Sequence, residues 1–481
     1  MKGRFSIALL LLVACPPVED PGFPPPDVDD DDAVDDDDAG DDDDAGDDDD
    51  VSAIPPTFLR FVSPEDDDVL QFAHTIVLEA DGDAPGPVEV TLDGAELDTT
   101  SFNQTTGRAR VDLDTVLHPD GVYTLRAELT EHDLDDEIDV QLLNGDLLVY
   151  ELSPGALDSE DHPPVQLQVP DVGVSMQVQV DFAPTPNTEF AFGVVRESNG
   201  LYAIGGVPAP QYPTGASAAP PWAGGVPNHP NRDWPTGEYT FWPVANEEMN
   251  GAEATITAIV KRAFEEPVIG TLDLDLYFSP GCGLTASTAP THNDFGAFLG
   301  HIDGILQQAG ITLGTLRYFD VSGASFDVLN SHGEFMDLLA TGVPSSDRTL
   351  DLFFVTNVDL NAGPNINVLG VSAHRPGPAL RHGTLQSGVA VETPRIFNGN
   401  EDLAAHTAAH EIGHFLGLMH TSQVGGEEHD NLDDTVESCD ASDCWGTNLM
   451  DPLLDPGGPN ETITDDQTFV LLRHPLVQLI E

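Results

Sequence analysis

The sequence predicts a multidomain chain in which all-β sandwich modules are followed by an α/β (α+β) domain. Two features indicate this: apolar and polar residues alternate through the first half of the chain, and helical stripes join the strands in the second half. A third feature is an N-terminal stretch too polar to fold. The expected boundaries are 1–15 for a signal segment, 16–54 for a disordered tether, 55–145 and 146–267 for two sandwiches, and 268–481 for the α/β domain.

The first fifteen residues have the pattern of an export signal. Lys2 and Arg4 precede an apolar run over residues 7–13, which is too short to span a bilayer. Residues 12–15 (Leu-Val-Ala-Cys) resemble the bacterial lipoprotein box. The resemblance implies that Cys15 carries a lipid after cleavage and that the exported protein is anchored to the cell envelope, at the outer membrane or cell surface. A soluble secreted protein is the alternative.

Residues 16–54 are rich first in proline and then in Asp-Asp-Asp-Asp-Ala-Gly repeats, with 17 aspartates between Asp27 and Asp50. Mutual repulsion without apolar content predicts an extended, solvated tether. These aspartates account for only part of the formal net charge of −69, and beyond the signal segment the chain holds one lysine, Lys261. So acidic a protein excludes nucleic acid and anionic membrane surfaces as partners, which leaves the lipid as the expected membrane contact.

Short alternating strands follow the tether. In residues 55–145 they lie at 88–92 and 122–126, with an Asp-Gly turn signal after the first of them, and they predict a β-sandwich. This region resembles bacterial immunoglobulin-like modules, which implies either a spacer or a binding module. Strand patterns at 165–169, 176–180, 239–242 and 254–258 predict the second sandwich, for which the residues suggest no chemistry.

After residue 268 the pattern changes to that of an α/β domain. Apolar residues form a helical stripe between two predicted strands, and a third strand at 350–358 is apolar almost throughout, hence central. Two further strands are expected at 368–373 and 388–391. A helix is expected to start near Asn398 or Asn400, and a closing helix over 466–472 to be capped by Asp465 or Thr464. The stripe consists of Phe295, Phe298, Leu299, Ile302, Ile305 and Leu306.

The stretch over residues 410–420 carries the chemistry. His410 and His414 are four apart, so a helix places them on one face, where one Zn²⁺ can bind both. Gly417 can adopt a positive φ and turn the chain so that His420 approaches as a third ligand. Three imidazoles leave a tetrahedral ion one open position for water, and Glu411 is placed to take its proton. The alternative is a core helix whose histidine side chains are hydrogen-bonded by other groups of the protein and bind no metal.

This stretch resembles the metzincin clan of zinc endopeptidases, whose consensus is His-Glu-x-x-His-x-x-Gly-x-x-His followed by a Met-turn. Residues 448–452 look like that turn, with Met450 beneath the metal. The pappalysin-type branch is the most similar, although matrixin-like features are also present. One departure is that no tyrosine follows Met450.

The resemblance implies a zinc-dependent endopeptidase that cleaves extended proteins or peptides at the bacterial cell surface. His410, His414 and His420 would bind zinc, and Glu411 would be the general base. The substrate would lie along an edge strand near Val368, Leu369, Gly370 and Val371. The rival interpretation is a catalytically silent adhesin, a binding lipoprotein with a structural zinc site.

Smaller motifs support less specific expectations. In an exported chain Cys439 and Cys444 are expected to form a disulfide, with metal binding as the alternative, whereas Cys282 is expected to be an unpaired core thiol. His429 is a rival third ligand, but it lacks the motif spacing. The acidic loop after the histidines is either solvated or a structural Ca²⁺ site. Its candidate ligands are Asp430, Asp433 and Asp434.

Overall fold

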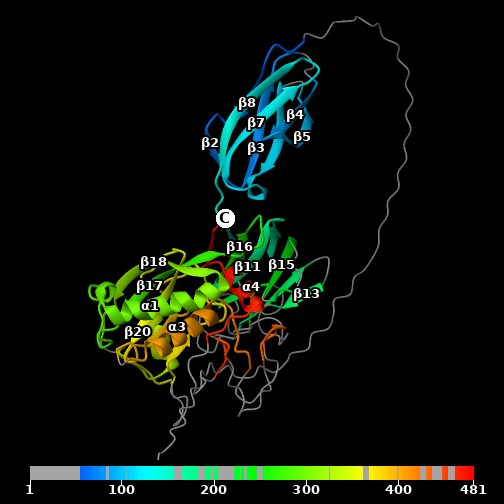
Figure 1. The fold of residues 1–481 in the computed structure, drawn as a ribbon. Helices are drawn as coiled ribbons and strands as arrows, with labels where there is room; N and C mark the ends of the chain where they lie inside the picture. Colours follow the sequence, from blue (N-terminus) through cyan, green and yellow to red (C-terminus); the bar gives the residue numbers. More distant parts are fainter. Residues whose placement is uncertain are drawn as a thin grey trace, which may run out of the picture. The chain divides into compact units, whose positions relative to one another are not determined.

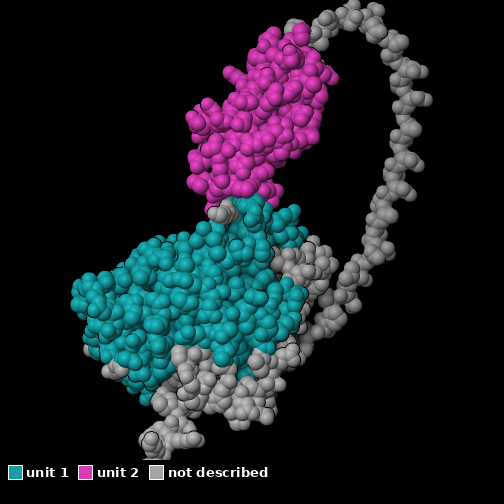
Figure 2. Space-filling model, viewed as in Figure 1, with its two compact units in different colours: residues 1–17, 146–481 teal, residues 18–145 magenta. Residues whose placement is uncertain are grey.

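The computed structural model describes residues 55–480, apart from 83–85, 104–105, 157–164, 183–189, 197–199, 204–221, 228, 232–235, 246–252, 324–325, 361–367, 398, 423–428, 436–446 and 453–460 (Figure 1). The chain is a multi-sheet, mostly β protein with few helices. It divides into two compact units, one of residues 18–145 and one of residues 1–17 and 146–481 (Figure 2). The signal segment, Cys15 and the tether lie outside the described residues. Within those residues, no helix has the length and apolarity needed to cross a membrane.

The unit that ends at residue 145 contains two antiparallel-rich sheets around one core, as expected of a sandwich. The sheet orders are β1-β3-β6 and β2-β8-β7-β4-β5. Alternate side chains of both sheets enter a shared apolar cluster, which is why the sequence has period two here. Asp93 and Gly94 both have positive φ, as a tight turn between β4 and β5 requires. The strands are β1 (Leu59–Ser63), β2 (Asp68–Leu70), β3 (Ala73–Ala80), β4 (Pro87–Leu92), β5 (Ala95–Ser101), β6 (Arg108–Asp114), β7 (Gly121–Leu129) and β8 (Leu134–Leu142).

The other unit begins with two four-stranded sheets. Their orders are β10-β15-β12-β13 and β14-β11-β16-β9, and every pairing in them is antiparallel. All four strands expected in this region are present. The strands are β9 (Leu147–Ala156), β10 (Val165–Val169), β11 (Gly173–Phe182), β12 (Phe190–Arg196), β13 (Gly200–Ala203), β14 (Trp222–Val226), β15 (Gly237–Ala245) and β16 (Glu253–Arg262).

A mixed sheet with helices on both faces completes this unit. Its order is β18-β17-β20-β23-β22, with parallel pairings except for β22, which runs antiparallel at the edge, and β24, which pairs antiparallel with β17. Helices α1 and α3 lie side by side on one face and share its core (Figure 1). Helix α2 packs on the other face. The strands are β17 (Gly270–Phe278), β18 (Ile311–Asp320), β19 (Val328–Leu329), β20 (Thr349–Val355), β21 (Asn357–Val358), β22 (Gly370–Ser372), β23 (Val389–Glu392) and β24 (Gln478–Leu479). The helices are α1 (Asn293–Leu306), α2 (His332–Leu339), α3 (Glu401–Phe415) and α4 (Asp465–Arg473).

Three helices agree with the sequence, and one was missed. The predicted apolar stripe of α1 is buried, α3 starts after Asn400, and Thr464 caps α4 in a capping box with Gln467. Helix α2 was not predicted. Its signal was the Ser-x-x-Glu spacing of Ser331 and Glu334, since the Ser331 hydroxyl accepts a hydrogen bond from the Glu334 backbone N–H at 3.2 Å.

The two four-stranded sheets formed by β9 to β16 are called the second pair of sheets below. Buried polar contacts connect them to the C-terminal segment. The Lys261 ammonium on β16 is fully buried and donates to the carbonyls of Leu472, His474 and Val477 at 2.5, 3.0 and 2.6 Å. It thereby satisfies backbone acceptors at and beyond the end of α4. The expected boundary between residues 267 and 268 falls inside this unit and stays a prediction.

We expect Lys261→Met to lower the free energy of unfolding by about 3 kcal/mol, because it leaves three buried carbonyls without their donor. Thermal denaturation of the full chain measures the loss. Thr255→Met, at an exposed position of the same strand, is the control and should change stability by less than about 0.5 kcal/mol. Equal melting temperatures for the two variants would contradict the capping role of Lys261.

Candidate metal centre

Three histidine rings converge at the end of α3. His410 and His414 lie one turn apart on the helix, with ring centroids 4.6 Å apart, and both are buried. Gly417 has φ = +112°, a conformation that other residues rarely adopt, and it turns the chain after the helix as predicted. This turn brings His420 back, so that its Nε2 lies 3.2 Å from Nε2 of His410 and 3.1 Å from Nε2 of His414.

Backbone carbonyls fix the protonation of two of these rings. Nδ1 of His410 lies 2.7 Å from the Leu449 carbonyl, and Nδ1 of His414 lies 2.8 Å from the Leu418 carbonyl. Because a carbonyl only accepts, each Nδ1 carries the hydrogen and each Nε2 presents its lone pair. Burial, together with the neighbouring rings, holds the pKa of both imidazoles well below the usual range, which keeps them neutral.

These nitrogens fit a zinc ion. Ligands at about 2.0–2.1 Å from a tetrahedral Zn²⁺ lie roughly 3.3 Å from one another, close to the two Nε2 separations here. Neutral imidazole nitrogen is also a preferred zinc ligand. Within the described part of the chain, no fourth His, Cys, Asp or Glu joins this group. The geometry therefore offers three ligands and an open position.

Glu411 follows the first ligand and faces β22. Its carboxylate accepts a hydrogen bond from the Ser372 backbone, and among the described residues its Oε1 has no hydrogen-bond partner. Burial raises the pKa of Glu411 to about 8, against the opposing effect of the Arg375 charge. A side chain at Gly370 would place its Cβ 2.8 Å from Cγ of Glu411, so only glycine leaves room for this carboxylate. A buried oxygen of this kind suits proton transfer.

The turn formed by residues 448–451, which contains Met450, contacts the histidine helix. It is closed by a 3.1 Å bond from the Asp451 N–H to the Asn448 carbonyl, and its Leu449 carbonyl is the one that orients His410. The Met450 side chain is fully buried, and its Sδ lies 2.8 Å from the position that a Cβ on Gly413 would occupy. Gly413, which lies between His410 and His414 in the sequence, therefore packs directly against Met450.

The predicted substrate strand lies where the sequence placed it, at the edge of the mixed sheet. Val368, Leu369 and Val371 are buried, and β22 pairs with β23 on one side. Its role in binding peptides stays a prediction.

The other predicted residues have mixed outcomes. Cys282 is a free thiol in the core, whereas Cys439 and Cys444 lie outside the described residues. His429 is exposed and its Nδ1 contacts the Asp430 carbonyl, away from the three histidines. The Ca²⁺ candidates do not form a group of convergent ligands: Asp430 is buried, while Asp433 and Asp434 bond to the first turn of α4.

A second buried cluster was missed by sequence reasoning. On the α2 face of the sheet, Nδ1 of His382 lies 2.7 Å from Oδ1 of Asp351, and Arg317 makes two 2.6 Å bonds to Asp275. Asp275, Asp351 and His382 also satisfy the spacing of metal ligands. The Arg317 guanidinium neutralises Asp275, and burial raises the pKa of Asp351 to about 6 beside His382. The signal was the aspartate inside the apolar strand β20.

No protein-family model matches the sequence, and no curated protein matches it. Among solved structures the chain is similar to metalloproteinase-II from Bacteroides fragilis, with 14% identity over 48% of this chain and 64% of that chain and a TM-score of 0.30. It is also similar to the endo-β-1,4-mannanase from Thermotoga petrophila (16% identity, 18% and 20% coverage, TM-score 0.16) and to trypsin-activated α-2-macroglobulin from Escherichia coli (14%, 31% and 12%, TM-score 0.15). The chain spans less than two thirds of each, and likenesses at these TM-scores identify neither a fold nor a function.

We expect Gly413→Ala to destabilise the protein by about 1–3 kcal/mol, because the new methyl group overlaps the Met450 sulfur. In the Met450→Ala background the same change should be neutral or stabilising, since alanine favours a helix over glycine by about 0.5–1 kcal/mol. Denaturant unfolding of the four proteins in the cycle measures this coupling. Gly300→Ala in α1, where a Cβ meets nothing within 4 Å, is the control and should not destabilise.

We expect the stability of the Asp430 loop to depend on pH. Burial raises the pKa of Asp430 to about 7, so its contribution to stability is complete below about pH 4 and is lost as the pH rises through 7. Asp430→Asn removes this ionisation. In protein freed of metal by a chelator, the variant should be more stable than wild type by on the order of 2 kcal/mol at pH 8, but not at pH 4. Melting curves across this range, with exposed Asp433→Asn as the control, test it. Parallel pH profiles for Asp430→Asn and wild type would contradict the assignment.

Proposed function

We propose that this chain is a zinc-dependent endopeptidase of the metzincin type, most like its pappalysin branch, acting on extended protein or peptide substrates. The observation that carries the proposal is the convergence of three Nε2 atoms, from His410, His414 and His420, beside the buried side chain of Glu411. Three neutral nitrogens with an open position are the ligand set of a catalytic zinc site.

When bound, zinc would polarise the scissile carbonyl and lower the pKa of a water molecule toward ~7. The chain supplies the rest of the chemistry. Glu411 accepts the proton at its carboxylate, oriented by the Ser372 amide, and passes it to the leaving amine. The edge strand around Val371 would align an extended peptide by backbone hydrogen bonds, which do not depend on the substrate sequence.

The surrounding features are proposed on sequence grounds alone. Lipid at Cys15 and the aspartate tether would hold the enzyme at the bacterial cell envelope, exposed to protein substrates. A disulfide between Cys439 and Cys444 would stiffen the approach to Met450.

The rival function is a zinc-containing surface adhesin without turnover. The Glu411 environment argues against it, because a buried carboxyl group whose Oε1 bonds to none of the described residues destabilises a fold and contributes nothing to a purely structural metal site. A proton-transfer role explains why such a group is present.

The test is Glu411→Gln in the full chain. We expect one zinc per chain in both proteins by mass spectrometry, and a loss of roughly 10²–10⁴-fold in kcat/KM for the variant on a broad peptide library. Glu401→Gln, in the first turn of α3, is the matched control and should retain activity. A wild type that binds zinc but is as inactive as Glu411→Gln would favour the adhesin.

A further inference from the structure

Between β22 and β23 the chain passes around the C-terminal end of helix α3. Gly377 makes the closest approach: its N–H donates to the Phe415 carbonyl at 2.7 Å, and a Cβ at Gly377 would lie 2.2 Å from the Phe415 ring. Phe415 is the last residue of α3 and follows the ligand His414. At its other end this segment, residues 373–381, directly follows Ser372, whose backbone bonds to Glu411. The segment is therefore connected to the metal centre at both ends of this stretch, through Ser372 and through Gly377.

The outer side of this segment contacts β11 of the second pair of sheets. The Gln177 amide donates to the Gly377 carbonyl and accepts from the Ala379 N–H, both at 2.8 Å, as a paired β-strand would. The Gln179 amide donates to the Ala379 carbonyl at 2.7 Å and to Oε1 of Gln177 at 2.8 Å. Both glutamines are 1% exposed, so water does not compete for these bonds.

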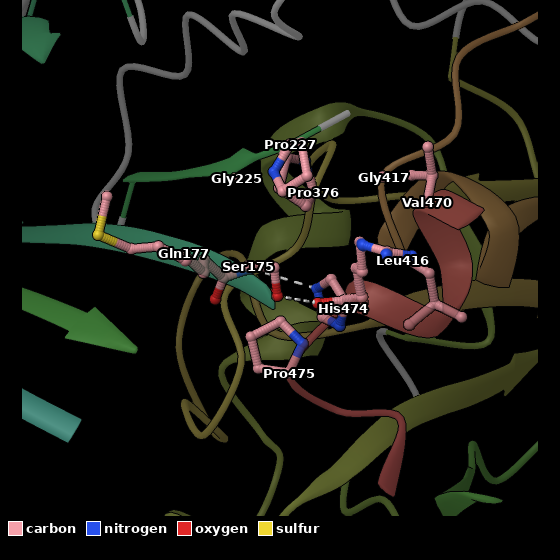
Figure 3. A pocket seen from close by; sticks show the side chains of 12 residues that line it. Ser175, Gln177, Gly225, Pro227, Pro376, Leu416, Gly417, Val470, His474 and Pro475 are labelled. Atoms are coloured by element: carbon pink, nitrogen blue, oxygen red, sulfur yellow. Dashed lines mark hydrogen bonds between the residues drawn. The ribbon is translucent and has the colours of Figure 1, made fainter. Parts of the chain in front are cut away.

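A small pocket, partly open to solvent, lies beside the segment at this junction. Gln177 and His474 border it together with Pro376 and Gly417 (Figure 3). The directional contacts between the segment and β11 are therefore the hydrogen bonds of the two glutamine amides.

We propose that Gln177 and Gln179 are positioning residues for the metal centre, acting through the segment 373–381 on Glu411 and on the end of α3. The role in turnover rests on the proposed function, whereas the positioning of the segment does not. The second pair of sheets thus supplies part of the scaffold of the metal centre.

The test compares Gln177→Met and Gln179→Met with Val178→Ala in the full chain. Methionine keeps the length of glutamine but forms none of these hydrogen bonds. Val178 is fully buried on the opposite face of the same strand, so its truncation reports loss of stability without loss of the amide contacts. Zinc content, melting temperature, hydrogen exchange of residues 374–381 and peptide cleavage are measured for each.

We expect hydrogen exchange in residues 374–381 to become roughly tenfold faster in the two glutamine variants and to stay unchanged in Val178→Ala. Zinc content should stay at one per chain, and kcat should fall roughly ten- to a hundredfold with little change in KM. Unchanged exchange and kcat in Gln177→Met would overturn the proposal, and so would an equal fall of kcat in Val178→Ala at a matched loss of melting temperature. If wild type cleaves no peptide but the exchange changes as expected, the proposed function fails and the positioning of the segment stands.

Discussion

Three imidazole Nε2 atoms that converge on one point are the constraint on which the rest of this centre depends. Nε2 of His420 lies 3.2 and 3.1 Å from Nε2 of His410 and of His414, so the protein must hold three buried rings in one arrangement. It does so with backbone: the Leu449 and Leu418 carbonyls fix two rings, and the turn at Gly417 brings in the third. Metal binding and local folding are therefore coupled here.

The strongly acidic composition makes buried cations valuable. The only lysine beyond the signal segment is not on the surface but fully buried, where it donates to three carbonyls. Arg317, partly exposed on the edge strand β18, pairs with the buried Asp275, beside the contact of His382 with Asp351. In a chain with a net charge of −69, these basic side chains thus bond to acceptors within the fold.

Local signals were readable from the sequence, and long-range burial was not. The histidine spacing, the Gly417 turn and the Thr464 cap depend on residues within a few positions of one another. The alternating strands β10 and β11 look alike, yet Gln166 and Gln168 are exposed, whereas Gln177 and Gln179 are buried. Residues about 200 positions away decide that difference, so no periodicity could have indicated it.

That difference also shows how the second pair of sheets contacts the metal centre. The polar face of β11 bonds to the backbone of residues 377–379, and β16 bonds to that of residues 472–477. Residues on the two sides of position 267 therefore share buried hydrogen bonds. Because unsatisfied buried amides and carbonyls destabilise a fold by about 1–3 kcal/mol each, these contacts couple the stability of the sheets to that of the segments beside the metal centre.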